Sequence, residues 1–206
     1  MNSIKFLGLY IDNFLKWSTH IDTLAKKLSS ACFAIKTVSK ELTPTTALMT
    51  YFSLFESYLC YGLPFWGSCS LYHFESIFKL QKRAIRYVFG LSSRTHCENY
   101  FKNFKILTLP ALFIFESVCL VRKHIQKLSE RPTRRYPTRN LDTDIYLTIP
   151  TSDLIKNSIT YNAKKLYNNL PIQLKSINSY DKFRRSTRAF LQERPFYTVA
   201  EFYNMH

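Results

Sequence analysis

Glycine scarcity most constrains what this chain can fold into, because glycine occurs only four times in 206 residues. A sandwich or barrel of many strands needs many tight turns, and tight turns commonly need glycine. Helices need glycine mainly at their ends. Hydrophobic residues make up 46% of the chain and charged residues 21%, which leaves enough apolar surface for a buried core. We therefore expect a mainly α fold with one or two short β-strands.

Apolar residues recur at helical spacing in several segments, and local signals mark where the helices begin and end. Thr43 before Pro44 is a helix start, and Thr95 and Thr198 each precede a glutamate by three residues, as in a capping box. Gly90 is a terminator. The predicted helices span 19–40, 43–61, 71–89, 95–104, 108–128, 158–169 and 180–193, followed by a last turn capped by Thr198.

Two segments are β-prone rather than helical. Residues 4–11 indicate one short strand that ends at the turn pair Asp12-Asn13 and has no predicted partner within the chain. Residues 145–149 alternate apolar and polar side chains, which is a weaker strand signal. These elements divide the chain into four predicted parts: 1–15 with the strand, a helical bundle over 16–128, a basic, proline-bearing linker over 129–150, and a smaller helical segment over 151–206.

The chain is strongly basic, and the charge is concentrated in one region. The net charge is +15, and residues 76–140 hold fourteen basic side chains against three acidic ones. A polyanionic partner is therefore expected near the middle of the chain. In the predicted helix over 71–89, four cations fall within an arc of roughly 100°, opposite the apolar side. They are Lys79, Lys82, Arg83 and Arg86.

Two interpretations of these four cations stay open. Positive side chains on one face repel one another unless phosphates or other anions lie against them, which favours a nucleic-acid contact. The alternative is a solvated face that only keeps the helix soluble. The linker adds a second basic cluster that includes Arg134 and Arg135, and this cluster is either an arm that grips nucleic acid or a solvated linker.

No motif indicates catalysis or a metal site. The chain has no glycine-rich phosphate loop and no Asp-Asp pair, whereas polymerase chemistry needs clustered carboxylates that hold two metal ions. Two sets of Cys and His residues have spacing too irregular for a zinc site. They are Cys60, Cys69 and His73, and His96, Cys97, Cys119 and His124. We interpret the cysteines as small buried apolar side chains, and we predict no catalytic residue, metal, cofactor or small-molecule substrate.

Signals of cellular location agree with one another. The first ten residues lack the apolar core and cleavage site of a secretory signal, and five cysteines without a CxxC pair indicate reduced thiols. No uncharged apolar run approaches the roughly 18 residues of a membrane helix. We expect an intracellular protein, cytoplasmic or nuclear, that is not secreted and has no membrane partner.

Seven short motifs follow one another from residue 4 to residue 202. They are 4–12 (IKFLGLYID) continued by Leu15-Lys16-Trp17 and His20-Ile21, Tyr61-Gly62 with Trp66-Gly67, 81–86 (QKRAIR), Ile106-Leu107-x-Leu109, Ser158-x-x-Tyr161-Asn162-Ala163, Asn169-Leu170-Pro171, and Phe196-Tyr197-x-Val199-x-Glu201-Phe202. Each motif alone is weak, but their order resembles the carboxyl-terminal part of non-LTR (LINE, jockey-like) retrotransposon reverse transcriptases. The resemblance covers nearly the whole chain and only the end of the family's protein.

The resemblance implies that the parent is an RNA-directed DNA polymerase with Mg²⁺ as its cofactor. Residues 1–15 would end the palm, with Phe6, Leu7 and Gly8 next to the primer grip, and residues 16–128 would form a thumb-like domain that clasps template–primer. The implied partners are RNA, DNA or an RNA–DNA hybrid, and the missing fingers and palm. Because the family's metal-binding aspartates are absent, the resemblance implies no polymerase activity of this chain alone.

Two other functions are kept beside this one. The chain is alternatively an inert truncated remnant, whose distinguishing feature is the strand over 4–11 without a partner. It is alternatively a stand-alone helical nucleic-acid-binding protein, which would bind at physiological salt without the rest of a polymerase.

Overall fold

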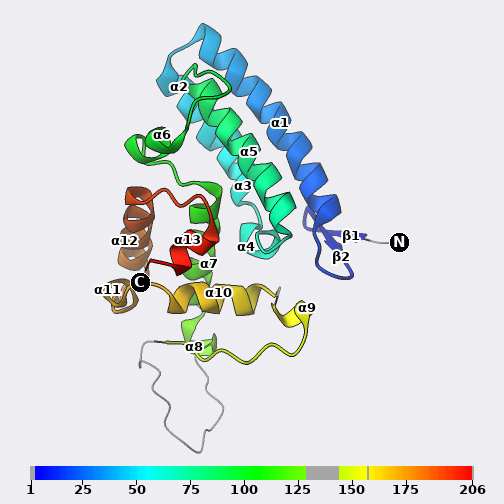
Figure 1. Ribbon diagram of the computed structural model, residues 1–206, viewed down its shortest axis with the longest axis vertical. Helices are drawn as coiled ribbons and strands as arrows, with labels where there is room; N and C mark the ends of the chain where they lie inside the picture. The colour runs from blue at the N-terminus through cyan, green and yellow to red at the C-terminus, as the bar shows by residue number, and fades with distance from the viewer. Residues whose placement is uncertain (1–2, 129–143, 157, 206) are drawn as a thin grey trace, which may run out of the picture.

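The computed structural model describes residues 3–128, 144–156 and 158–205, and these form a mainly helical protein with one two-stranded sheet (Figure 1). The predicted fold class is confirmed. Four predicted helix starts are also confirmed, because the side-chain hydroxyl accepts a hydrogen bond from the backbone N–H three residues further on. They are Thr43, Thr108, Ser158 and Thr198.

The predicted single strand over 4–11 is wrong, because the segment folds back on itself as a hairpin. Strand β1 (Ser3–Phe6) pairs antiparallel with β2 (Leu9–Asp12). A two-residue hairpin turn of this kind needs positive φ at both central residues, and φ is 45° at Leu7 and 83° at Gly8. The strand therefore has its partner within the chain.

Asp12 ends β2 and sets the direction of the chain into the first helix. Its carboxylate accepts hydrogen bonds from the backbone N–H groups of Phe14 (3.1 Å), Lys16 (2.9 Å) and Trp17 (2.6 Å). The prediction of a turn at Asp12 is confirmed, and the turn anchors the hairpin to the helix that follows.

Three helical rods form a bundle next to the hairpin. The first rod is α1 (Ser18–Glu41). The second rod is continuous and consists of α2 (Pro44–Thr50), the π-helical η1 (Tyr51–Glu56) and α3 (Ser57–Cys60). After the short α4 (Leu63–Trp66), the third rod is α5 (Leu71–Val88). α1 and α5 lie side by side, and the second rod contacts both (Figure 1). The predicted apolar side of α5 is buried in this bundle.

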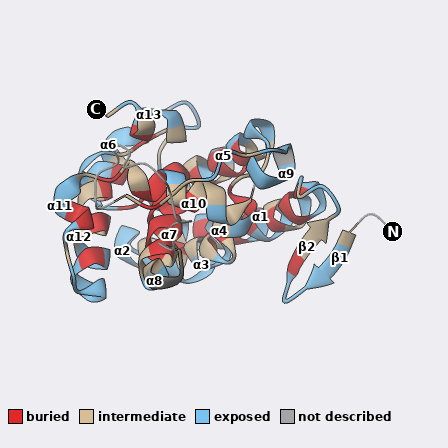
Figure 2. Ribbon diagram, turned by 90° about the horizontal axis from the view of Figure 1, so that it is seen from below, coloured by how far each residue is buried: buried red, intermediate tan, exposed pale blue. Residues whose placement is uncertain are grey.

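The second half of the chain is organised around one buried helix. The remaining helices are α6 (Glu98–Asn103), α7 (Leu109–Lys123), α8 (Ile125–Leu128), α9 (Asp153–Lys156), α10 (Ile159–Asn168), α11 (Ile172–Lys175), α12 (Tyr180–Glu193) and α13 (Val199–Tyr203). α7 contacts α3, α4 and α5 of the first half and α10, α12 and α13 of the second, and it is largely buried in Figure 2. Buried side chains of both halves therefore form one core. Among the described helices, none combines the length and apolar character that a membrane crossing requires.

The predicted capping box at residue 95 is wrong. α6 is preceded by Cys97, whose side chain makes no capping hydrogen bond. The hydroxyl of Thr95 instead lies 2.9 Å from that of Ser92, and the backbone carbonyl of Thr95 accepts a hydrogen bond from Arg86. The loop before α6 is thus organised by contacts with itself and with α5, which the spacing of Thr95 and Glu98 did not reveal.

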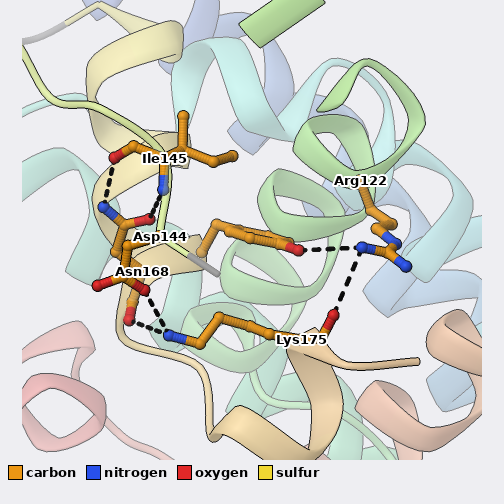
Figure 3. A network of polar contacts seen from close by, with 6 residues as sticks. Arg122, Asp144, Ile145, Asn168 and Lys175 are labelled. Atoms are coloured by element: carbon orange, nitrogen blue, oxygen red, sulfur yellow. Dashed lines mark hydrogen bonds and ion pairs between the residues drawn. The ribbon is translucent and has the colours of Figure 1, made fainter. Parts of the chain in front are cut away.

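The predicted strand over 145–149 is also wrong, and Figure 3 shows the reason. The side-chain amide of Asn168 accepts from the Ile145 N–H at 2.9 Å and donates to the Ile145 carbonyl at 2.8 Å. Lys175 Nζ lies 2.7 Å from the Asp144 carboxylate and 2.9 Å from the Asn168 carbonyl. Because a side chain takes the hydrogen bonds that a strand partner would take, this segment is extended along α10 without a sheet.

Candidate nucleic-acid interface

The four cations predicted to share one face of α5 divide into two pairs. Lys79 and Arg83 are exposed. Arg83 lies on the side of α5 that borders α1, since its Nη2 donates to Ser29 Oγ at 3.3 Å. Lys82 and Arg86 are half-buried. The predicted basic face therefore exists, but only one pair of its cations is fully open to a ligand.

Lys82 and Arg86 pack against residues outside the bundle. Lys82 Nζ lies 4.6 Å from the centroid of the Phe78 ring and 5.6 Å from that of Tyr197. Partial burial, and next the positive charge of Arg86, lower the pKa of Lys82 below its usual value. Arg86 Nε donates to the Thr95 carbonyl at 3.0 Å. Both side chains thus hold neighbouring segments against α5 and are less accessible to a partner than Lys79 and Arg83.

α1 adds exposed cations beside those of α5, and these were not predicted from the sequence. Lys26, Lys36 and Lys40 are exposed, and Phe33, which lies among them, is 73% exposed. Lys36 Nζ lies 5.5 Å from the centroid of the Tyr87 ring of α5, so this side of α1 borders α5. The recurrence of these positions every three or four residues was the signal that would have found them.

We call this area the α1–α5 surface and define it by Lys26, Phe33, Lys36, Lys40, Lys79 and Arg83. None of its cations forms an ion pair with a described residue. The exposed acids Asp22 and Glu75 lie one turn before Lys26 and Lys79, at the end near the hairpin. Lys36, Lys40 and Arg83 lie further along the two helices than these acids, and the exposed Glu41 follows Lys40 at the end of α1.

The hairpin turn holds the three residues predicted to lie next to a primer grip. Phe6 and Leu7 are 60% and 74% exposed, and the turn stands beside the start of α1 (Figure 2). The hydroxyl of Tyr61 donates to the Leu7 carbonyl, and a Cβ on Gly8 would lie 3.6 Å from the Tyr61 ring. The end of α3 therefore fixes the turn in place. Arg134 and Arg135, the other predicted contacts, lie outside the described residues.

The cysteine and histidine sets weighed as zinc ligands do not assemble in the described part of the chain. No group of three or more His, Cys, Asp or Glu side chains within residues 3–128, 144–156 and 158–205 is placed to hold a metal ion. Burial raises the pKa of Cys60, Cys69 and Cys119 to about 12, so these thiols keep their protons at neutral pH. Their environment is that of packing residues.

Comparison with protein-family models, with curated proteins and with solved structures finds no match to this chain.

Proposed function

We propose that the chain binds RNA–DNA hybrid or related template–primer nucleic acid through phosphates, as the thumb-like and carboxyl-terminal part of a non-LTR retrotransposon reverse transcriptase. The α1–α5 surface carries the proposal, because five exposed cations lie on two adjacent helices without an ion-pair partner among the described residues. Packed helix axes lie about 8–10 Å apart, so the two rows can meet phosphates at neighbouring places on one duplex. Phosphate contacts carry no sequence information, so we expect binding without sequence preference.

The order of the seven sequence motifs supports the family part of this proposal. The parent would be an RNA-directed DNA polymerase, and its Mg²⁺ would be held by the family's aspartates, which have no matching Asp-Asp pair in this sequence. We propose no polymerisation by this chain alone. The exposed side chains of Ile4 (69%) and Phe6 (60%) share one face of β1 and support a contact with the palm of the parent.

The test is fluorescence anisotropy with a short, labelled RNA–DNA hybrid at several salt concentrations. We expect tight binding that weakens steeply with salt. Replacing Lys36, Lys79 and Arg83 by glutamine is expected to reduce the slope of log K against log salt by roughly 2.7, at about 0.9 for each phosphate contact. The proposal is wrong if this triple variant keeps the slope of the unmodified chain.

A matched control separates a local contact from the effect of net charge. Lys123, Lys182 and Arg185 are exposed on α7 and α12, away from the α1–α5 surface. Replacing these three by glutamine removes the same charge and is expected to change the slope far less. If the two triple variants reduce the salt slope equally, the net charge of the whole chain drives binding and no defined surface exists.

The structure bears differently on the two alternative functions, an inert remnant and a stand-alone nucleic-acid-binding protein. One argument for the remnant hypothesis, a strand without a partner, does not apply, because β1 pairs with β2. The inert remnant stays an alternative. A stand-alone nucleic-acid-binding protein remains an outcome of the same titration. Affinity that persists at physiological salt, without any palm fragment, would favour it over a fragment that needs its parent.

A further inference from the structure

Three aromatic rings gather at the surface where the end of α5 meets α6. Phe89 follows the last residue of α5, Tyr100 lies on α6, and Phe104 follows the end of α6. The centroid of the Phe89 ring lies 4.2 Å from that of Phe104 and 5.1 Å from that of Tyr100. The rings of Tyr100 and Phe104 are within 4° of parallel, with centroids 6.5 Å apart. Phe89 therefore packs against both rings of α6 while they stay parallel to each other.

This aromatic cluster is open to solvent, unlike the rings of the core. Phe104 is 46% exposed, and Phe89 and Tyr100 are half-buried. Lys36 lies over the ring of Tyr87, but no cation of the described residues lies over any of the three rings of the cluster. The cluster therefore offers an exposed aromatic surface to a partner with flat rings.

The charges around the cluster are mainly positive. Between residues 91 and 106 the chain carries Arg94, Lys102 and Lys105, and its one acidic residue there is Glu98. All three cations are exposed, and none forms an ion pair with a described residue. A partner that complements this part of the surface is therefore an anion that also carries flat rings.

The basic face of α5 connects this cluster with the α1–α5 surface. On one side of α5, Arg83 donates to Ser29 of α1 at 3.3 Å. On the other side, Arg86 donates to the carbonyl of Thr95, in the loop before α6, at 3.0 Å. Figure 1 accordingly shows α6 on the opposite side of α5 from α1. A strand that leaves a duplex on the α1–α5 surface can therefore reach the aromatic cluster across α5.

We propose that unpaired nucleotides next to a bound duplex stack on this cluster. We call the site the α6 platform and define it by Phe89, Tyr100, Phe104, Lys102 and Lys105. Bases of a duplex cover one another, whereas an unpaired base has open faces that stack on aromatic rings, and nearby lysines meet its phosphates. Every base has such faces, so we expect little sequence preference. The inference deepens the proposed function and rests on it for the duplex that the unpaired strand extends.

The test compares a blunt RNA–DNA hybrid with the same hybrid extended by about five unpaired nucleotides. Competition against one labelled probe gives the ratio of the two affinities. We expect the extension to increase affinity about fivefold or more, as stacking of a single base does. Phe104→Leu keeps an apolar side chain but removes the ring, and it is expected to abolish most of this gain. Phe104→Tyr restores a ring and is expected to keep the gain.

The source of the unpaired strand is distinguished by two arms of the same experiment. An RNA extension stands for the template and a DNA extension for the primer or a displaced strand, because stacking alone accepts both. A larger gain with RNA would assign the α6 platform to the template, and a larger gain with DNA would assign it to a DNA strand.

A matched control tests whether the effect is local. Phe65 on α4 is 48% exposed, close to the exposure of Phe104, and Phe65→Leu is expected to leave the gain unchanged. Replacing Lys102 and Lys105 by glutamine gives a second measurement at exposed positions. It is expected to reduce the salt slope for the extended hybrid by roughly 1.4, at about 0.7 for each phosphate of a single strand, and to leave the slope for the blunt hybrid unchanged.

Three results would overturn the inference. If neither extension increases the affinity of the unmodified chain, the cluster does not bind unpaired nucleotides, and an acidic protein segment becomes the better partner. If Phe104→Leu keeps the whole gain, the rings do not stack on bases. If Phe65→Leu loses as much of the gain as Phe104→Leu, the effect does not arise at the α6 platform.

The proposed function and this inference fail separately. Phe104→Leu is expected to bind the blunt hybrid as the unmodified chain does, because the duplex lies on the α1–α5 surface. If the extension gives no gain while the triple variant of Lys36, Lys79 and Arg83 still reduces the salt slope, only the inference is wrong. If the triple variant keeps the slope while the gain depends on Phe104, the α1–α5 surface is wrong and the α6 platform remains a site for unpaired strands.

Discussion

Replacing His20 by leucine is expected to stabilise the protein, although it removes a side chain from the core. The imidazole is 5% exposed and leaves two ring nitrogens without partners. A buried polar group without a hydrogen bond costs about 1–3 kcal/mol. Leucine has a similar volume and fills the space beside Trp17 and Trp66 without that cost. We expect the free energy of unfolding at neutral pH to rise by roughly 1–2 kcal/mol, within the lower part of this range.

The pH dependence of stability gives the same prediction a second, sharper test. Burial, and next the positive charge of Lys27, lower the pKa of His20 from 6.5 to about 4. Between pH 6.5 and about pH 4, the unfolded chain therefore binds a proton that the folded chain does not bind. Stability is therefore lost as pH falls through this window. At about 1.4 kcal/mol per pKa unit, the whole shift amounts to about 3 kcal/mol, and the part that falls between pH 7 and pH 4.5 is roughly 2 kcal/mol. The His20→Leu variant has no imidazole to protonate, so its free energy of unfolding is expected to fall less on acidification by this amount.

The assay is urea unfolding of both proteins, followed by circular dichroism, at about pH 7 and about pH 4.5. Other titrating groups contribute equally to the two proteins, so the difference between them isolates His20. Glu56 is one such group, because burial raises its pKa to about 7 and its contribution has the opposite sign over the same range. The reasoning is refuted if the variant is less stable at pH 7, or if both proteins lose the same free energy on acidification.

Three further substitutions test the core. Gln81→Leu leaves the buried hydroxyl of Tyr51 and two backbone groups without the hydrogen bonds that Gln81 makes to them. We expect urea unfolding to show that the free energy of unfolding falls by about 2–4 kcal/mol. Gly67→Ala would place a Cβ against the Phe113 ring and 2.7 Å from the Leu63 carbonyl oxygen, and we expect thermal unfolding to show a loss of about 1–3 kcal/mol. Glu56→Gln removes a carboxyl whose raised pKa costs stability as pH rises from 4.5 through about 7. Relative to the unmodified protein, the free energy of unfolding of the variant in urea is expected to increase by roughly 2 kcal/mol over that range.

The sequence predicted the helices well because helix signals are local. Apolar spacing and a capping hydroxyl within three residues are properties of one segment, and Thr43, Thr108, Ser158 and Thr198 cap their helices as expected. The hairpin was missed because its turn places a leucine at positive φ, which few leucines adopt. Eight β-prone residues with one glycine therefore resembled an uninterrupted strand.

The candidate sites needed the tertiary structure. The sequence located cations on one face of α5, but it could not show that neighbouring segments hold Lys82 and Arg86. Nor could it show that α1 brings Lys36 beside Tyr87 of α5. The cavity between the hairpin turn, α1 and α3 was equally hidden, because three separate segments line it. Periodicity fixes which side of a helix is apolar, because that depends on residues three or four positions apart. Which helices become neighbours depends on burial between distant segments, so the surfaces they share are decided only when the whole core packs.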